Sequence, residues 1–443
     1  MFLLLQCLGA CAPATAQDNH PDVIVFVLDT MRADHLDLSG DGTPTMRALA
    51  ERGVVYENAH SVSSWTPPSI MSLMTGQYAD RHGVLEGPIP KRAESAESGR
   101  ELLPLPVLDK STLTLAQHFR RNGYQTAGVT TNHLMLSRQG YARGFELYDK
   151  LGVDDMEVHP GPKTANPDAP QEWCLEARGQ APADAEKVHA KLLEFSDALE
   201  TDPRPDFVWV HLMDAHQPYH RRAPGFVDEA DPVDEMKSAY ASEIAWMDHW
   251  VERIVADLEM EDAIIVVISD HGDAFGEHEK WGHGLNTRTW QEVNDVVFLV
   301  AGPGVPQGRV VRDNVSQVDL APTLASLAGV RKLPQAVDGL DLTEPLPERA
   351  VIGYRGGLKT IETGTWMVVQ DDWKLMQWRG GEALYRGDDE QTSLVEEDGT
   401  PLQTLREALD DYRATVVLRS PAETEIEVDE ATLEGLRALG YLE

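Results

Sequence analysis

The order of apolar and helical segments constrains the fold of this chain more than any other feature. The run Val23–Leu28 is apolar throughout, as expected of a strand that is buried on both faces of a sheet. Further short apolar runs follow at Thr126–Thr130, Phe207–Leu212, Ala263–Ile268 and Val296–Val300. Helical periodicity fills the intervals, so the pattern predicts an α/β fold: a large, mostly parallel sheet with helices on both faces.

The helical intervals carry their own start and stop signals. Thr43 and Pro44 are typical of an N-cap and a first helical turn, and Gly53 is expected to close that short helix. Three longer helices are predicted from periodicity at about residues 115–123, 188–199 and 238–258.

The pattern changes after about Gly329. Residues 366–370 and 374–378 are predicted to be antiparallel strands, with Gly380-Gly381 as the next turn, and a last helix is predicted from about Glu430 to Leu439. We therefore expect a main domain at residues 21–330 and a small C-terminal α+β subdomain at residues 331–443. The polar, Pro- and Gly-rich stretches 86–106 and 153–185 are predicted to be long loops that shape a pocket.

Residues 1–20 are predicted to be an export signal and a tether. Phe2–Leu5 is apolar, and Leu8-Gly9-Ala10-Cys11 resembles a bacterial lipobox, in which the cysteine becomes the lipid-modified first residue. The usual positive charge before the apolar run is missing. We expect the protein to act outside the cytoplasm, in the bacterial periplasm or as an outer-membrane lipoprotein, and to contact a membrane only through that N-terminal lipid.

Charge excludes two classes of partner. The 443 residues carry a formal net charge of −36, from 74 acidic and 38 basic side chains, and such a surface repels nucleic acid and acidic membranes. It also repels an anionic substrate at long range. Because salt screens charges beyond about 10 Å, however, cations within a cleft can dominate locally.

Four polar clusters lie just beyond the predicted strands. Asp29 follows the first strand, Asp214-Ala215-His216 follows Phe207–Leu212, Asp270-His271-Gly272 follows Ala263–Ile268, and His283 lies in the loop after that. Because ligands of parallel sheets gather beyond the carboxyl ends of the strands, these side chains are expected to meet. Carboxylates and imidazoles suit Mn, Zn, Mg or Ca, so the clusters predict a site for a divalent cation.

A specific resemblance comes from the segment Ser64–Ile70 and the following Thr75-Gly76. It is similar to the signature of the sulfatase family in the alkaline phosphatase superfamily, in which Cys or Ser, any residue, Pro, Ser and Arg stand a fixed distance before Thr-Gly. Alignment on Pro68, Ser69 and Thr75-Gly76 places Thr66 at the position of the nucleophile. Further segments that resemble sulfatase-like proteins are Leu28–His35, His211–Tyr219, Ser269–Gly272, Asp319–Leu324 and Leu436–Tyr441.

Two departures from the signature bear on the chemistry. Sulfatases convert their Cys or Ser to formylglycine, whose hydrate attacks sulfur and then expels sulfate from its second hydroxyl. Thr66 cannot be converted to that aldehyde, so no formylglycine is expected, and Ile70 replaces the arginine. An ester formed on Thr66 must then be resolved by an external nucleophile, as in the phosphatases, phosphodiesterases and lipid phosphotransferases of the superfamily.

The resemblance also implies roles for the clustered residues. Asp29, Asp270, His271 and the Thr66 hydroxyl are expected to hold the cation, which activates Thr66 for attack on the ester. His216 and His283 are expected to stabilise the transferred group and to protonate the leaving group, and with Asp214 they could instead hold a second metal. Asp214 and His133 are expected to contact substrate, although Thr131 replaces the lysine of the family two places before His133.

Each of these residues also has a structural interpretation. Thr66, which precedes Pro67, could be the N-cap of a helix, His216 and His283 could be bonded to backbone, and His211 could brace the sheet. The expected function is a metal-dependent hydrolase of sulfate or phosphate esters on a small molecule, glycan or lipid. The alternatives are a phosphodiesterase, a phosphonate hydrolase, a phosphoglycerol or phosphoethanolamine transferase, or an inactive relative that binds sulfated glycans or a partner protein.

Overall fold

The computed structural model describes residues 20–85, 94–95, 101–151, 184–199, 202–220, 225–284, 287–356, 364–395, 399–415 and 423–428. An eight-stranded sheet forms its centre, with the strand order β13-β2-β12-β9-β1-β8-β6-β7. The parallel part consists of β9 (Ile264–Ser269), β1 (Val23–Leu28), β8 (Asp206–Leu212), β6 (Gln125–Thr130) and β7 (Leu147–Lys150). The predicted α/β class with a mostly parallel sheet is confirmed.

The other end of the sheet changes direction. β12 (Phe298–Ala301) runs antiparallel both to β9 and to β2 (Gly53–Tyr56), and β13 (Arg309–Val311) pairs in parallel with β2. Short elements connect these strands: η1 (Ala33–His35), β3 (Ala59–His60), α3 (Ala79–His82), η2 (Ser137–Gln139), β10 (Ala274–Phe275), η3 (Glu277–Glu279), β11 (Trp281–Gly282), α8 (Gln291–Asn294), β14 (Val315–Ser316) and η5 (Gln317–Asp319).

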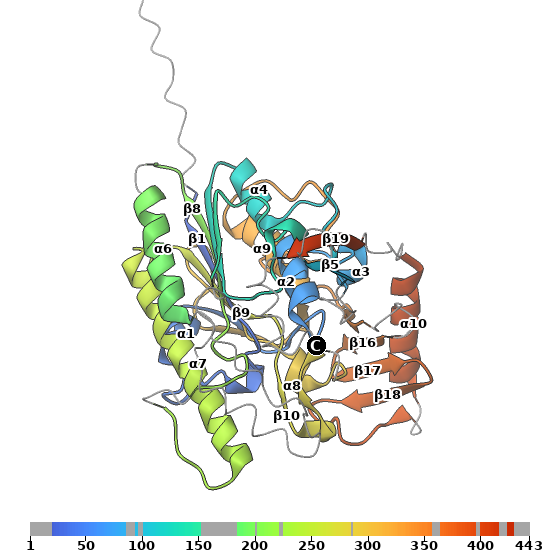
Figure 1. The fold of residues 1–443 in the computed structure, drawn as a ribbon. Helices are drawn as coiled ribbons and strands as arrows, with labels where there is room; N and C mark the ends of the chain where they lie inside the picture. Colours follow the sequence, from blue (N-terminus) through green and yellow to red (C-terminus); the bar gives the residue numbers. More distant parts are fainter. Residues whose placement is uncertain are drawn as a thin grey trace, which may run out of the picture.

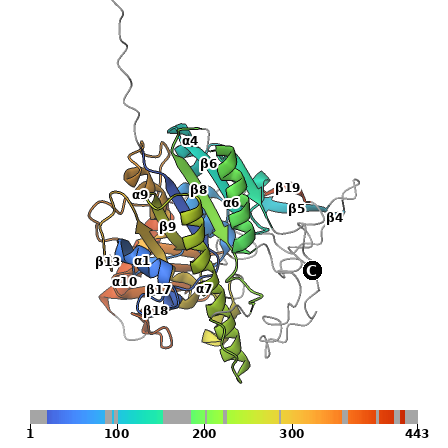
Figure 2. The ribbon, with the colours of Figure 1, turned by 90° about the vertical axis from the view of Figure 1, so that its left-hand side faces the viewer.

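Helices cover both faces of the sheet (Figure 1). One face packs against α1 (Pro44–Glu51), α6 (Ala185–Leu199) and α7 (Pro232–Asp257), the last two of which lie side by side in Figure 2. The other face packs against α2 (Thr66–Thr75), α4 (Leu115–Arg121) and α9 (Leu320–Leu327). Successive residues of β1 point alternately into the apolar core on one face of the sheet and into the core on the other face. Every residue of that strand is therefore apolar.

The start and end of α1 differ from the prediction. Thr43 is the N-cap residue, but its side chain does not cap the helix. Asp248 of α7 accepts the hydrogen bonds from the backbone N–H groups of Thr45 and Met46 at 2.9 and 2.8 Å instead. Gly53 begins β2 rather than closing the helix. Glycine suits this position because a Cβ would lie 2.3 Å from the carbonyl oxygen of Val300 on the paired strand.

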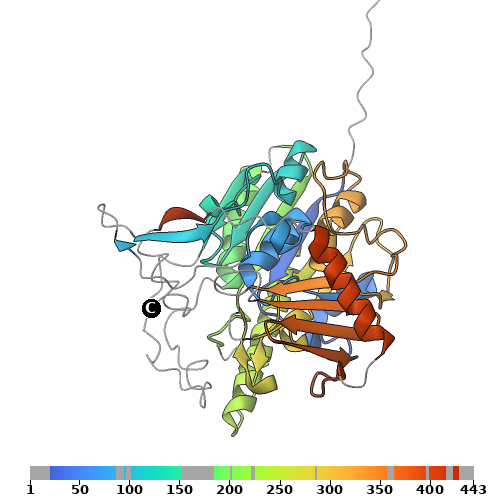
Figure 3. The same cartoon turned by 90° about the vertical axis from the view of Figure 1, so that its right-hand side faces the viewer.

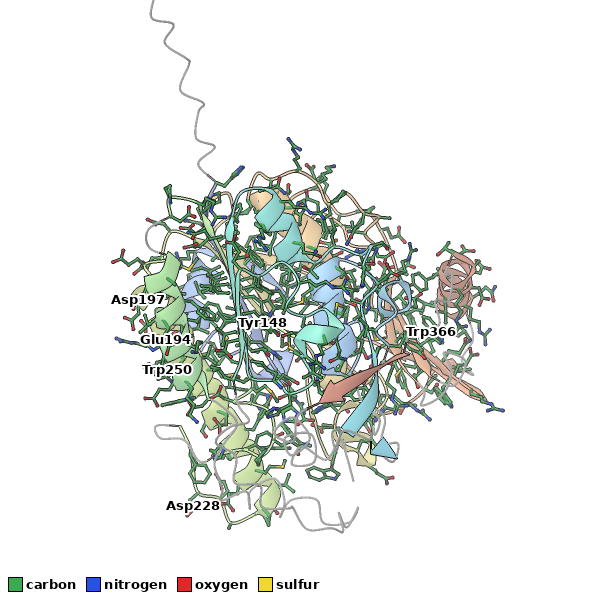
Figure 4. The ribbon with its side chains drawn as sticks, turned by 45° about the horizontal axis from the view of Figure 1, so that its top comes forward. Tyr148, Glu194, Asp197, Asp228, Trp250 and Trp366 are labelled. Carbon is green, nitrogen blue, oxygen red and sulfur yellow. The ribbon has the colours of Figure 1, made fainter. Side chains whose placement is uncertain are left out.

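A second, four-stranded sheet forms the C-terminal part. It consists of β15 (Val351–Arg355), β16 (Thr365–Gln370), β17 (Trp373–Trp378) and β18 (Gly381–Arg386), all antiparallel, so the two strands predicted there are confirmed. Helix α10 (Thr400–Thr415) covers one face of this sheet (Figure 3). Trp366, labelled in Figure 4, lies between the sheet and α10, with the Arg413 guanidinium 4.9 Å from its ring.

The predicted loop 86–106 is wrong in part. Residues Glu101–Pro106 form strand β5, which pairs with β4 (Glu94–Ser95) and with β19 (Glu423–Val428) from the end of the chain (Figure 3). The signal and tether, the loop from residue 153 to 183 and the helix predicted at 430–439 lie outside the described residues. Within the described ranges, no helix combines the length and the apolar character that a bilayer crossing requires.

Candidate active site

The carboxyl ends of four adjacent parallel strands bring polar side chains together. Asp29 follows β1 and Asp270 follows β9, and the two strands are direct neighbours. Both carboxylates and His271 are fully buried. One donor atom from each of the three residues lies within 4.8 Å of the others. The three residues therefore lie close together, as the sequence predicted.

Thr66 lies directly at this cluster. It is the first residue of α2, while Trp65 occupies the N-cap position without a capping side chain. The Thr66 Oγ1 atom lies 3.1 Å from His271 Nε2, and the residue is fully buried. Its hydroxyl therefore faces the cluster rather than capping the helix, and the positive end of the α2 dipole favours negative charge at this point.

A buried hydrogen-bond network fixes the start of α2 against β9. The Gln317 side-chain amide donates to the carbonyl oxygens of Ser269 and Asp270 at 2.9 and 2.7 Å. Its oxygen accepts from the Val62 N–H at 3.1 Å, and the Ser61 hydroxyl donates to the Asp270 carbonyl at 2.7 Å. The segment that leads to Thr66 is thus bonded to the strand end that carries Asp270.

The tautomer of His271 follows from its contacts. Its Nδ1 lies 2.8 Å from the carbonyl oxygen of Gly272, an acceptor only, so Nδ1 carries the proton. The Nε2 lone pair then faces Thr66 and Asp270. Burial lowers the pKa of His271, which keeps the imidazole neutral, as a metal ligand must be.

Two carboxylate oxygens in the cluster lack a donor. Asn132 donates to Asp29 Oδ2 at 2.9 Å, and the Thr30 N–H donates to Asp270 Oδ1 at 3.1 Å. The remaining oxygens, Asp29 Oδ1 and Asp270 Oδ2, are buried and have no hydrogen-bond partner among the described residues. A buried carboxylate oxygen is costly unless a hydrogen bond or a cation compensates it. The donor set therefore fits a divalent cation held by Asp29, Asp270, His271 and the Thr66 hydroxyl.

The charges of the two neighbouring carboxylates also favour a bound cation. Burial and the charge of Asp29 raise the pKa of Asp270, whereas the nearby Thr66 hydroxyl and His271 oppose that rise. Burial also disfavours the charged form of Asp29, but His211, at 3.2 Å from Oδ2, and the other imidazoles lower the pKa of Asp29 below its usual range. The pair repels itself when both groups are ionised, and a cation between the carboxylates would relieve that repulsion.

His216 and His283 flank His271. The His216 and His283 ring centroids are 5.0 Å apart, and those of His271 and His283 are 4.5 Å apart. His216 Nδ1 bonds to the carbonyl oxygen of Gln217 at 2.7 Å. His283 Nδ1 lies 3.1 Å from Asp273 Oδ1, while the Tyr219 hydroxyl donates to Asp273 Oδ2 at 2.6 Å. His216 is therefore backbone-bonded, as the structural interpretation expected, and His283 is held by a carboxylate.

The two residues expected to contact substrate have different environments. Asp214 Oδ1 accepts a hydrogen bond from the Ala185 N–H at 3.2 Å, so this carboxylate supports the start of α6. His133 follows β6 and is fully buried, and neither of its ring nitrogens has a hydrogen-bond partner among the described residues. Burial lowers the pKa of His133 to about 4, so the imidazole is neutral at pH 7.

Several residues contact the site although no role in it was predicted for them from the sequence. Asn132 and His211 contact Asp29, although His211 also bonds to Thr130 at 3.0 Å, as a sheet-bracing residue would. Asp273 and Tyr219 hold His283. Asn132 adjoins His133, and Asp273 follows the Asp270-His271-Gly272 cluster, so their places in the sequence could have marked them as neighbours of the site. The residues that they contact could not be predicted from the sequence.

A hydroxyl at a helix N-terminus faces acidic and imidazole groups at the carboxyl edge of a mostly parallel sheet, an arrangement that suits an ester hydrolase with an alkaline-phosphatase-like fold. The sulfatase family model matches residues 21–330, and the chain belongs to the sulfatase family. Its curated relatives include the choline-sulfatase of Rhizobium meliloti, which is 24% identical over 426 residues, with 79% of this chain and 78% of that protein covered.

Solved structures share the fold over almost the whole chain. Ps i-CgsB, solved in complex with k-i-k-neocarrahexaose, matches with a TM-score of 0.68 and 16% identity over 94% of this chain and 96% of that chain. The phosphonate monoester hydrolase of Agrobacterium radiobacter matches with a TM-score of 0.65 and 18% identity over 92% of this chain and 100% of that chain. At these identities the likeness concerns the fold.

Proposed function

We propose that this chain is a metal-dependent hydrolase of sulfate- or phosphate-type esters that uses the unmodified Thr66 hydroxyl as its nucleophile. The observation that carries the proposal is the position of Thr66 Oγ1, 3.1 Å from Nε2 of His271, which belongs with Asp29 and Asp270 to one buried group of metal-ligating side chains. The N-cap role that could otherwise explain Thr66 belongs to Trp65.

One divalent cation is proposed as the cofactor, with Asp29, Asp270, His271 and Thr66 as its protein ligands. When bound, it lowers the pKa of a coordinated hydroxyl and offsets negative charge on the ester oxygens. Asn132 and His211 hold the Asp29 carboxylate in place, and outer contacts of this kind tune metal affinity. Calcium, manganese, zinc and magnesium all suit this donor set.

The proposed reaction has two transfers. Thr66 loses its hydroxyl proton to solvent and Thr66 Oγ attacks sulfur or phosphorus, and the bond to the leaving alcohol breaks while His283 Nε2 gives that oxygen a proton. Water then attacks the Thr66 ester and gives a proton to His283, the bond from sulfur or phosphorus to Thr66 Oγ breaks, and Thr66 Oγ takes a proton back from solvent. Asp273 bonds to His283 Nδ1, so it fixes the orientation of the ring and leaves Nε2 as the nitrogen for proton transfer. His216, His133 and Asp214 are proposed to bind the substrate anion or its neighbouring groups.

The proposed substrate is an anionic ester on a small molecule, a glycan or a lipid. The names of the related proteins cover both ester classes, since they include a choline-sulfatase and a phosphonate monoester hydrolase. Nucleic acid is not a proposed partner, because the net charge is −36. We also propose that the protein acts outside the cytoplasm, in the periplasm or on a membrane through a lipid at Cys11, on the basis of the N-terminal sequence.

A transferase is the second candidate function. Threonine has no second hydroxyl from which to eliminate sulfate, so the Thr66 ester must be attacked by a second molecule. A glycerol- or ethanolamine-type alcohol could take the place of water in that step. Product analysis with and without added alcohol acceptors separates the two candidates, because a transferase forms a new ester instead of free sulfate or phosphate.

The test is a panel of nitrophenyl sulfate, phosphate monoester, phosphodiester and phosphonate substrates, assayed with Mn, Zn, Mg or Ca. Thr66→Ala is expected to lower kcat/KM on the best substrate by at least about a thousandfold, which corresponds to about 4 kcal/mol. Thr66→Ser keeps a hydroxyl and should retain part of the activity. Intact-mass measurement should find Thr66 unmodified.

Ser64→Ala is the matched control. Ser64 lies two residues before Thr66, and its hydroxyl is buried and has no hydrogen-bond partner among the described residues, so its loss should leave the activity nearly unchanged. Activity of Thr66→Ala within about tenfold of wild type, or a larger loss in Ser64→Ala, would show that Thr66 is not the nucleophile. A folded chain that binds no divalent metal and turns over no panel substrate would support the inactive relative.

A further inference from the structure

A second group of metal-ligating side chains lies apart from the active site. His278, Glu292 and Glu390 each bring a donor atom within 4.8 Å of the other two. They come from three segments: η3, α8 and the turn that follows β18. We propose that these three residues form a divalent-cation site of the zinc or manganese type, which joins the catalytic sheet to the C-terminal sheet. It shares no residue with the second metal site considered at Asp214, His216 and His283.

An unpartnered carboxylate oxygen points independently to a cation. The Glu292 side chain is only 7% exposed, and its Oε1 has no hydrogen-bond partner among the described residues. A carboxylate in such a position is costly unless something positive compensates it. A bound cation would supply that compensation.

The His278 ring is held in one orientation. It stacks on the Trp290 indole with the centroids 3.8 Å apart and the planes at 7°. Its Nε2 lies 3.8 Å from Glu292 Oε2, which is too long for a hydrogen bond but leaves room for a shared ion. The His278 backbone has φ of +52°, a conformation that costs free energy in a residue with a side chain. The fold therefore maintains this ring position against a local cost.

The charges of the group are not balanced without a further cation. Lys374 Nζ lies 2.6 Å from Glu390 Oε1, and the Gln291 N–H donates to Glu390 Oε2 at 2.7 Å. These contacts fix Glu390 while each oxygen keeps a second lone pair. Because Lys374 balances only one of the two carboxylates, the group retains one excess negative charge when His278 is neutral. An imidazole with two carboxylates suits zinc or manganese better than calcium, which prefers oxygen ligands alone.

The position of the site gives the ion a structural role. α8 packs closely against the loop that carries His271. The Gly272 N–H donates to the Val293 carbonyl at 3.0 Å, and a Cβ on Gly272 would lie 2.1 Å from the Glu292 carbonyl oxygen. Glu390 and Lys374 belong to the C-terminal sheet region. An ion held by Glu292 and Glu390 would therefore bind that sheet to the helix that supports the active-site loop.

Metal stoichiometry tests the proposal. The tag-free full chain is equilibrated with buffered Zn²⁺ and, in parallel, Mn²⁺, and bound metal is measured by inductively coupled plasma mass spectrometry. An Asp29→Asn, Asp270→Asn background isolates the new site, and we expect it to bind about one ion per chain. Adding Glu292→Gln should weaken that binding at least about tenfold. Glu279→Gln is the matched control, because Glu279 lies in the same turn but is exposed, and it should change nothing.

If the double variant does not fold, the same substitution is measured in the otherwise wild-type chain. There Glu292→Gln should remove one ion, leave the active-site ion in place, and abolish the part of the Co²⁺ absorption spectrum that reports a histidine–carboxylate site. The melting temperature of the isolated-site variant should rise with the logarithm of free Zn²⁺. The proposal is overturned if the folded background binds neither metal, or if Glu292→Gln binds as tightly as its control. Lys374 would then be the only cation of the cluster.

Discussion

At the scale of single residues, the environment of each group decides what it can do. Asp29 and Asp270 are chemically identical, yet their pKa values shift in opposite directions. Burial disfavours the charged form of both, but the His211 hydrogen bond and the nearby imidazoles outweigh burial at Asp29, while burial and the charge of Asp29 dominate at Asp270. His216 and His283 differ in their hydrogen-bond partners. The first bonds to a backbone carbonyl and the second to the Asp273 carboxylate.

The Asp273 contact predicts a dependence on the leaving group. Asp273→Asn should lower kcat about ten- to a hundredfold for alkyl esters, because the His283 imidazolium loses its carboxylate partner. Nitrophenyl esters need little protonation of the leaving group and should lose much less. The measurement is the slope of log kcat against leaving-group pKa, which should become steeper. Tyr219→Phe, which removes only the bond to Asp273 Oδ2, should show the same trend more weakly. An equal loss across the series would mean that Asp273 acts only on folding.

At the scale of elements, the site depends on how α2 is attached to β9. The α2 N-terminus carries Thr66, and Gln317 of η5 bonds both to the Asp270 strand end and to the segment that precedes α2. Thr30 adds a second attachment: it has φ of +58°, and its N–H and hydroxyl bond to Asp270 and to the Ala215 carbonyl. Strained residues held in this way are common where geometry matters for function.

Gln317 should therefore be a structural requirement for the site. Gln317→Leu leaves the Val62 N–H and the carbonyl oxygens of Ser269 and Asp270 without this partner, and we expect it to lower the free energy of unfolding by about 2 to 4 kcal/mol. Urea unfolding measures the change. Gln403→Leu on the exposed side of α10 is the control and should stay within about 0.5 kcal/mol of wild type. A loss at Gln317 no larger than the control would show that the network contributes little.

At the scale of the whole molecule, the dominant feature is the excess of acidic side chains. The formal net charge is −36, and self-repulsion of that size destabilises a compact state. Two groups of acidic and imidazole side chains bring their donor atoms within 4.8 Å of one another, one at the carboxyl edge of the main sheet and one at the junction with the C-terminal sheet; these are the two proposed cation sites. Both groups connect segments that are distant in the sequence.

Chelation and salt should consequently have opposite effects on stability. EDTA treatment should lower the melting temperature, because ions that bind only the folded chain stabilise it by mass action. In the metal-free protein, an increase of NaCl from about 20 mM to about 500 mM should raise the melting temperature, because salt screens the self-repulsion. Differential scanning calorimetry measures both. The metal-loaded chain should respond less to salt, and an equal response would argue against this role of the cations.

The sequence alone predicted the fold class, which the structure confirms, and it also singled out the residues that we propose as metal ligands. Strands that are buried on both faces must be apolar without interruption, so Val23–Leu28 could be identified as a central strand. The end of such a strand is where a polar residue meets the site, so Asp29 and Asp270 could be identified as well. The nucleophile position of Thr66 came from the spacing of its family signature.

Only the tertiary structure decided the partners of these residues. Asn132 bonds to Asp29 across 103 residues, and Gln317 bonds to Asp270 across 47. The β5–β19 pair joins segments from opposite ends of the chain, and the group of His278, Glu292 and Glu390 exists only because the C-terminal sheet packs beside α8. Local patterns record whether a residue is buried and in which kind of element. The identity of a contact across the fold depends on how the elements pack, and no local pattern contains that information.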